Sequence, residues 1–164
     1  MAESTHRGVS VSRRIEASVP TVFAVLLDPV SHCAIDGSGM LREAITTATI
    51  VGVGDTFTIR MHNDEMGGYE ITNHVVEFER DRLVSWEPVL TAASREEDAG
   101  DLGERAGHRW TFHLTAPEPG ATLVTETYDS SRAPEWLRRA VRNGERWRPS
   151  MLTTLERLDA LCAR

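Results

Sequence analysis

Glu126 is the residue whose type and position most favour acid–base chemistry in this sequence. The alternation of apolar and polar residues over positions 122–129 predicts a strand in which Glu126 and Tyr128 share the buried face. A buried carboxyl is either paired with a cation or protonated, with a raised pKa. In the protonated state it could act as a general acid or base, or bind a ligand hydroxyl. The alternatives are an ion pair with Arg13 or Arg60, or the opposite strand parity, which would expose the carboxyl.

His32 and Asp36 form a second candidate pair for proton transfer. They lie four residues apart at the end of a short helix predicted at residues 30–35, so both side chains can face one side. Histidine titrates near neutral pH, and a nearby carboxylate would support proton transfer by its imidazole. The alternative is structural: Asp36 caps the turn at residues 37–39, whose two glycines permit a tight connection, and His32 packs against the entrance of a cavity.

Other kinds of site find no support in the sequence. The remaining histidines and the two cysteines, Cys33 and Cys162, do not have the spacing of metal ligands. A serine nucleophile elbow and a phosphate-binding glycine loop are also missing from the sequence. We therefore expect no metal, no cofactor and two free thiols.

The rest of the chain supplies the elements that would position these residues. Alternation predicts seven strands, and stretches with helical spacing predict helices between the first two strands and after the last one. The predicted strands cover residues 9–17, 41–50, 56–63, 69–80, 83–88, 108–116 and 122–129. The predicted helices cover residues 18–27, 30–35, 133–147 and 149–164. A parity shift between Ile71 and Phe78 predicts a β-bulge, and residues 94–107 are expected to form a polar hairpin loop.

The C-terminal helix must bury an apolar stripe, and the predicted sheet offers the surface for it. The stripe consists of Met151, Leu152, Leu155, Leu158, Leu161 and Cys162. We expect a ligand cavity between the sheet and the first half of this helix. The residues predicted to contact the ligand are Phe57, Ile59, Met61, Tyr69, Trp86, Trp110, Phe112, Tyr128, Met151 and Leu155. The alternative is that these side chains fill the core and leave no cavity.

Length and charge place the chain among single-domain proteins. Residues 1–164 are predicted to form one domain, with residues 1–8 as a disordered terminus. The formal net charge of −7 argues against nucleic acid and against anionic membranes as partners. The start is polar, and no segment has the length of an apolar membrane span. These features predict a cytoplasmic protein without stable membrane insertion, as a monomer or homodimer.

Three stretches of the sequence form a recognisable pattern. They are residues 9–17 followed by Pro20, Val22, Phe23 and Leu27-Asp28-Pro29; residues 32–40 with the segment Ile35-Asp36-Gly37-Ser38-Gly39; and Trp110-Thr-Phe with residues 120–126, followed by the Met151…Leu155…Leu158 helix. This pattern resembles the helix-grip superfamily of pollen-allergen-like and START-like proteins, also called SRPBCC, and within it the polyketide cyclase/dehydrase-like branch of small bacterial proteins. The resemblance implies an α+β fold in which a seven-stranded antiparallel sheet wraps around the C-terminal helix, with two short helices between the first two strands. It also implies an apolar cavity between sheet and helix as the ligand site.

Two functions follow from these observations. The first is a carrier or sensor that binds a hydrophobic or aromatic small molecule, lipid-like or polyketide-like, and this function is favoured because no obvious catalytic set is present. The second is an aromatase/cyclase or dehydratase that acts on a polyketide-like substrate in the same cavity, with Glu126, His32 or Asp36 in proton transfer. A protein-interaction domain of the co-chaperone-activator kind would need an exposed apolar patch, for which the acidic segment 94–107 gives little support.

Overall fold

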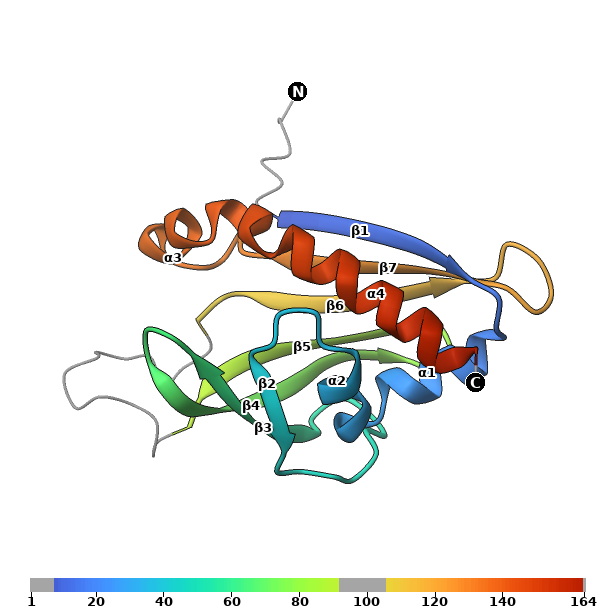
Figure 1. The fold of residues 1–164 in the computed structure, drawn as a ribbon, viewed down its shortest axis with the longest axis horizontal. Coiled ribbons are helices and arrows are strands. Elements are labelled where there is room, and N and C mark those ends of the chain that lie inside the picture. Colours follow the sequence, from blue (N-terminus) through green and yellow to red (C-terminus); the bar gives the residue numbers. More distant parts are fainter. Residues whose placement is uncertain (1–7, 92–105, 164) are drawn as a thin grey trace.

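The computed structural model describes residues 8–91 and 106–163. The predicted terminus 1–8 and the predicted loop 94–107 lie outside these ranges except at residues 8, 106 and 107. The described residues form one antiparallel sheet with helices packed on it (Figure 1).

Seven strands make up the sheet, in the order β1-β7-β6-β5-β4-β3-β2, and all neighbours are antiparallel. The strands are β1 Gly8–Ile15, β2 Leu41–Ala44, β3 Thr56–Asn63, β4 Gly67–Glu79, β5 Leu83–Leu90, β6 Arg109–Thr115 and β7 Thr122–Asp129. Consecutive strands from β2 to β7 are neighbours, and β1 pairs with β7 at the far edge. The fold class predicted from the sequence, α+β with a seven-stranded antiparallel sheet, is confirmed.

Two short helices, α1 Val19–Leu26 and α2 Pro29–Ile35, connect β1 to β2. Local sequence explains where they begin. The Ser18 hydroxyl accepts a hydrogen bond from the Thr21 N–H, and the Asp28 carboxylate accepts one from the Val30 N–H. Proline stands in the first turn of both helices, where its missing N–H has no consequence. Asp28 and the proline after it therefore end one helix and begin the next.

The long C-terminal helix α4, Arg148–Cys162, lies across one face of the sheet (Figure 1). It contacts β1 and β7 and both short helices. Its buried residues are Met151, Thr154, Leu155 and Leu158. The predicted stripe is wrong at Leu152, which is 46% exposed. Thr154 is buried in its place because α4 also packs against the end of α2, where the Thr154 hydroxyl accepts a hydrogen bond from the Gly37 N–H at 2.9 Å.

The segment after β2 departs from the predicted strand 41–50. Regular pairing with β3 ends at Ala44, although Thr46 still contacts Thr58 through its hydroxyl. The chain then leaves the sheet and docks on α1, where the Ile50 N–H donates to the carbonyl of Leu27 at 2.9 Å. Ile50 is buried there. The burial of Ile50 therefore reflects its position against the end of α1 and not a position in the sheet.

The predicted helix 133–147 is broken into α3, Glu135–Ala140, and the 3₁₀ helix η2, Arg142–Trp147. The break follows from Asn143 and Gly144, whose φ angles are +52° and +95°. A Cβ atom at Gly144 would lie 2.7 Å from Cδ1 of Tyr128, so only glycine permits this close approach to β7. The backbone at this point therefore brings η2 onto the sheet.

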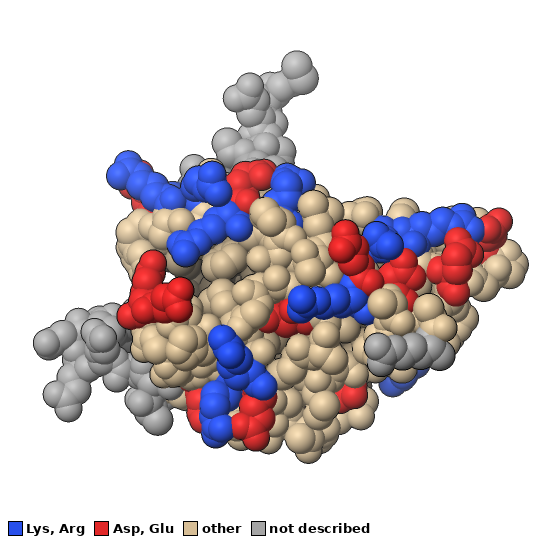
Figure 2. All heavy atoms as spheres, viewed as in Figure 1, with Lys and Arg blue, Asp and Glu red and all other residues tan. Residues whose placement is uncertain are grey.

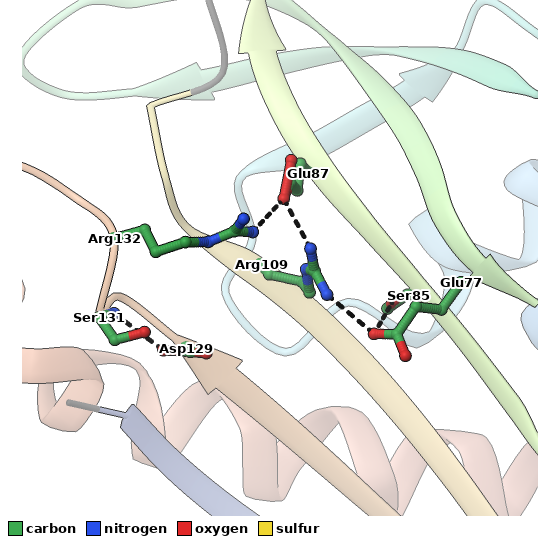
Figure 3. A network of polar contacts seen from close by, with 7 residues as sticks. All are labelled: Glu77, Ser85, Glu87, Arg109, Asp129, Ser131 and Arg132. Carbon is green, nitrogen blue, oxygen red and sulfur yellow. Dashed lines mark hydrogen bonds and ion pairs between the residues drawn. The ribbon is translucent and has the colours of Figure 1, made fainter. Parts of the chain in front are cut away.

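An ion-pair network ties the opposite face of the sheet together. Arg109 of β6 donates to Glu77 of β4 at 2.9 Å and to Glu87 of β5 at 3.0 Å (Figure 3). Arg132, in the segment after β7, donates to the same Glu87 oxygen at 2.6 Å. The predicted β-bulge lies between Val75 and Glu77, beside this network, and is confirmed. The bulge places Glu77 beside Arg109 on the outer face.

Candidate functional site

A cavity of about 400 Å³ lies between the sheet and the helices. Strands β3 to β7 form one wall, and the ends of α2, α3, η2 and α4 form the other. Nine of the ten residues predicted to contact a ligand lie on its wall, namely Phe57, Ile59, Met61, Tyr69, Trp86, Trp110, Phe112, Tyr128 and Met151. Leu155 is not among the lining residues, because it lies one turn further along α4, fully buried in the core.

Aromatic rings in contact with one another form the centre of the cavity wall. Trp86 stacks on His32 at 5.0 Å between ring centroids and meets Phe57 and Phe112 at 5.4 and 5.7 Å. The cross-strand partner of Trp86 is Trp110, which lies on the same cavity wall. Stacked and edge-to-face contacts of this kind hold large side chains in defined orientations. The wall is therefore an apolar surface of packed aromatic rings.

Glu126 lies on the cavity wall, and within residues 8–91 and 106–163 its carboxyl has no ion-pair partner. Only 5% of the residue is exposed, as the predicted strand parity required. Its Oε2 is buried without a hydrogen bond. The two arginines considered as partners are engaged elsewhere, since Arg13 donates to Asp159 at 2.9 Å and Arg60 pairs with Glu43. Burial, aided by the negative charge of Asp36, raises the pKa of Glu126 to about 8.

Glu87 provides a direct contrast with Glu126. Both glutamates are nearly fully buried, with exposed fractions of 4% and 5%. Glu87 lies on the outer face of the sheet, where Arg109 and Arg132 compensate its charge (Figure 3). Glu126 lies on the inner face, where its neighbours on the adjacent strands are Val11 and Phe112. Glutamate is thus a paired carboxylate at Glu87 on one face of the sheet and, among the described residues, an unpaired acid at Glu126 on the other.

His32 and Asp36 both reach the cavity, but their side chains are engaged with the backbone. The His32 Nε2 lies 2.7 Å from the carbonyl oxygen of Leu26, and burial lowers the pKa of the imidazole. The Asp36 carboxylate accepts hydrogen bonds from the Ser38 N–H, the Ser38 hydroxyl and the Leu41 N–H. The two side chains share no hydrogen bond, so the geometry corresponds to the structural alternative: Asp36 holds the turn, and His32 packs in the wall.

A second polar group at the cavity joins Tyr128, a predicted ligand contact, to His108 and Trp147, which the sequence reasoning missed. The Nδ1 of His108 lies 3.1 Å from the Tyr128 hydroxyl, and burial lowers the pKa of His108 to about 4. Burial also raises the pKa of Tyr128 to about 12, although the nearby indole of Trp147 acts in the opposite direction. The Trp147 Nε1 is buried without an aligned acceptor. Strand parity could have found His108, because it lies two residues before Trp110 on the same face.

Two negative observations apply to the described part of the chain. Within residues 8–91 and 106–163, no three His, Cys, Asp or Glu side chains gather in a way that could hold a metal ion. Among the helices described in the same ranges, none combines the length and apolar character needed to cross a bilayer. On the face drawn in Figure 2, basic and acidic side chains are interspersed.

Comparison with known proteins adds a likeness in sequence and a likeness in fold. No protein-family model matches the sequence. The uncharacterized protein Rv0088 of Mycobacterium tuberculosis is 32% identical over 136 residues, which make up 82% of this chain and 51% of that protein. The chain therefore spans about half the length of the curated relatives it matches.

The solved structures that resemble this one share its architecture. Protein CV1439 from Chromobacterium violaceum superposes with a TM-score of 0.69 at 16% identity, over 96% of this chain and 98% of that one. An AHSA1-like protein from Aeromonas hydrophila superposes with a TM-score of 0.55 at 18% identity, over 94% of this chain and 93% of that one. Likeness at these identities shows the fold alone, a seven-stranded antiparallel sheet with a long C-terminal helix, compatible with the helix-grip fold.

Proposed function

We propose that this protein binds a hydrophobic or aromatic small molecule in the cavity, as a carrier or sensor, and that it is a START-like member of the SRPBCC superfamily, in the polyketide cyclase/dehydrase-like branch. The observation that supports binding is the cavity itself. It has a volume of about 400 Å³ and an aromatic wall, and its acid Glu126 has no ion-pair partner among the described residues. A largely apolar pocket with few polar groups is the usual form of a small-molecule site.

Native mass spectrometry of the freshly purified protein tests this proposal. The chain has a mass of 18.2 kDa, so a retained ligand would appear as a second species of higher mass. A panel of lipid-like and polyketide-like compounds is then screened for an increase in melting temperature, because a ligand that binds only the folded state stabilises it. An unliganded mass together with no shift across the panel would contradict the proposal.

Glu126 supports a second candidate function, an aromatase/cyclase or dehydratase. Its acid form could donate a proton to a substrate carbonyl, and its pKa of about 8 lies close enough to neutrality for the proton to be exchanged. The test compares the wild type with Glu126→Gln on a poly-carbonyl substrate, with product formation followed by mass spectrometry. An enzyme would lose turnover in the variant and keep substrate binding. Equal product formation in both proteins would remove Glu126 from any mechanism.

A further inference from the structure

Glu126 lacks the positive partner that a buried carboxylate needs, and no described residue of the cavity wall can supply it. All 18 basic residues of the sequence are arginines, since the chain contains no lysine. No described arginine is among the residues that line the cavity. The two histidines on the wall, His32 and His108, are buried groups whose pKa values are lowered, so neither carries a charge at neutral pH.

The groups near Glu126 make this part of the cavity attractive to a cation. Its strand neighbours, Val11 and Phe112, are apolar. The charged group that acts on it is the carboxylate of Asp36, which lines the same cavity and adds negative potential. Aromatic rings face the cavity from β5, β6 and β7 in Trp86, Trp110 and Tyr128, and their π faces attract ammonium groups. Acidic and aromatic groups together are typical of sites that bind organic cations.

We propose that the ligand of this cavity is a lipophilic amine, whose protonated nitrogen pairs with Glu126 while its apolar body lies against the aromatic wall. This inference rests on the proposed small-molecule binding and names the class of ligand. Binding is an exchange: the Glu126 carboxyl releases its proton to the solvent, and the ammonium group takes its place as the positive partner. Glu87 shows the equivalent arrangement within the chain itself, where arginines fill that role.

Three probes with one aromatic body and different head groups test the charge preference. They are 2-naphthylmethylamine, 2-naphthylmethanol and 2-naphthoate, measured by isothermal titration calorimetry at pH 7. A hydrogen bond to a charged partner corresponds to about a 10- to 100-fold gain in affinity. Release of the Glu126 proton at pH 7 costs about tenfold of this gain, so the amine should bind up to about tenfold more tightly than the alcohol. The naphthoate should bind most weakly, because its charge would meet two acids and no cation.

The number of protons released gives a second measurement that needs no mutation. A group with a pKa of about 8 is about 90% protonated at pH 7, so amine binding should release about 0.9 proton per site. Titration in buffers of different ionisation enthalpy measures this number. The alcohol should release none.

Two matched variants locate the effect at Glu126. Glu126→Gln keeps an uncharged polar group of the same size and should remove both the proton release and the amine preference. Glu87→Gln changes the other buried glutamate, on the outer face, and should preserve the preference.

The outcomes separate the two proposals. If the alcohol binds at least as tightly as the amine, or if the amine releases no proton, the amine inference fails and small-molecule binding stands. If none of the three probes binds and the neutral dye N-phenyl-1-naphthylamine does not bind either, the proposed function fails, and the amine inference fails with it.

Discussion

Replacement of Glu126 by glutamine should stabilise the protein, and the gain should grow with pH. The pKa of Glu126 is about 8 in the folded protein and 4.5 in the reference state of an exposed glutamate. The folded form therefore holds the proton more tightly than the unfolded form. Its contribution to stability is fully present below pH 4.5 and is lost as the pH rises from 4.5 to 8. Glutamine cannot ionise, so the variant avoids this loss.

The size of the gain follows from the difference between the two pKa values. Each pH unit between 4.5 and 8 lowers the free energy of unfolding by about 1.4 kcal/mol through this one group. At pH 7 the accumulated loss is about 3 kcal/mol, and above pH 8 it levels off at about 5 kcal/mol. Natural domains are stable by about 5–15 kcal/mol, so the effect should be large enough to measure in this protein.

Urea unfolding of both proteins at five pH values from 5 to 9 measures the effect. Other titrating groups are common to the wild type and to Glu126→Gln, so they cancel in the difference between the two free energies of unfolding. This difference should rise with pH and then level off near pH 8. Glu87→Gln is the control: it removes the buried negative charge that Arg109 and Arg132 share and should destabilise the protein.

A difference that stays constant from pH 5 to 9 would refute the reasoning. It would mean that the Glu126 carboxyl ionises at an ordinary pKa and is therefore hydrated or paired in solution. The proton release expected on amine binding would then disappear as well, because both results depend on the same protonated side chain.

Three further predictions test other parts of the molecule. The wild type should lose stability as the pH falls from 6.5 to 4, because His108, with its pKa lowered to about 4, takes up a proton in that range only when the chain unfolds. His108→Gln avoids this loss, so acid unfolding curves should show it to be less destabilised than the wild type by up to about 3 kcal/mol at pH 4. Gly37→Ala should lower the free energy of unfolding by about 1–3 kcal/mol in urea, because its Cβ would lie 2.2 Å from the Ser150 carbonyl oxygen; an unchanged value would mean that α4 shifts freely. Met61→Trp should fill the cavity and weaken ligand binding more than tenfold in calorimetry, whereas His62→Trp, on the exposed face of β3, should leave binding unchanged.

Much of the fold follows from local signals in the sequence. The caps at Ser18 and Asp28 define where the short helices begin, and the alternation along β7 places Glu126 and Tyr128 on the inner face. Such signals can be read from the sequence because capping and strand parity depend on residues close together in the chain. The break at Asn143 and Gly144 is local in the same way, since both residues adopt positive φ.

The errors arise where a distant element decides the outcome. Leu152 fits the apolar stripe by spacing, yet Thr154 is buried because the end of α2 meets α4 at that point. Ile50 fits the alternation of a strand, yet the chain has left the sheet at this point and the Ile50 N–H donates to the end of α1. Spacing along one element carries no information about which face a second element will cover.

The sequence by itself determined that Glu126 shares one strand face with Tyr128, because side chains alternate along a strand. Only the tertiary structure decided that this acid meets no counter-ion among the described residues and that Glu87 meets two. The reason is that ion pairs form between side chains of different strands and loops, whose proximity depends on the packing of the whole sheet. Arg109 and Arg132 converge on the outer face at Glu87, and no described arginine reaches the cavity on the inner one.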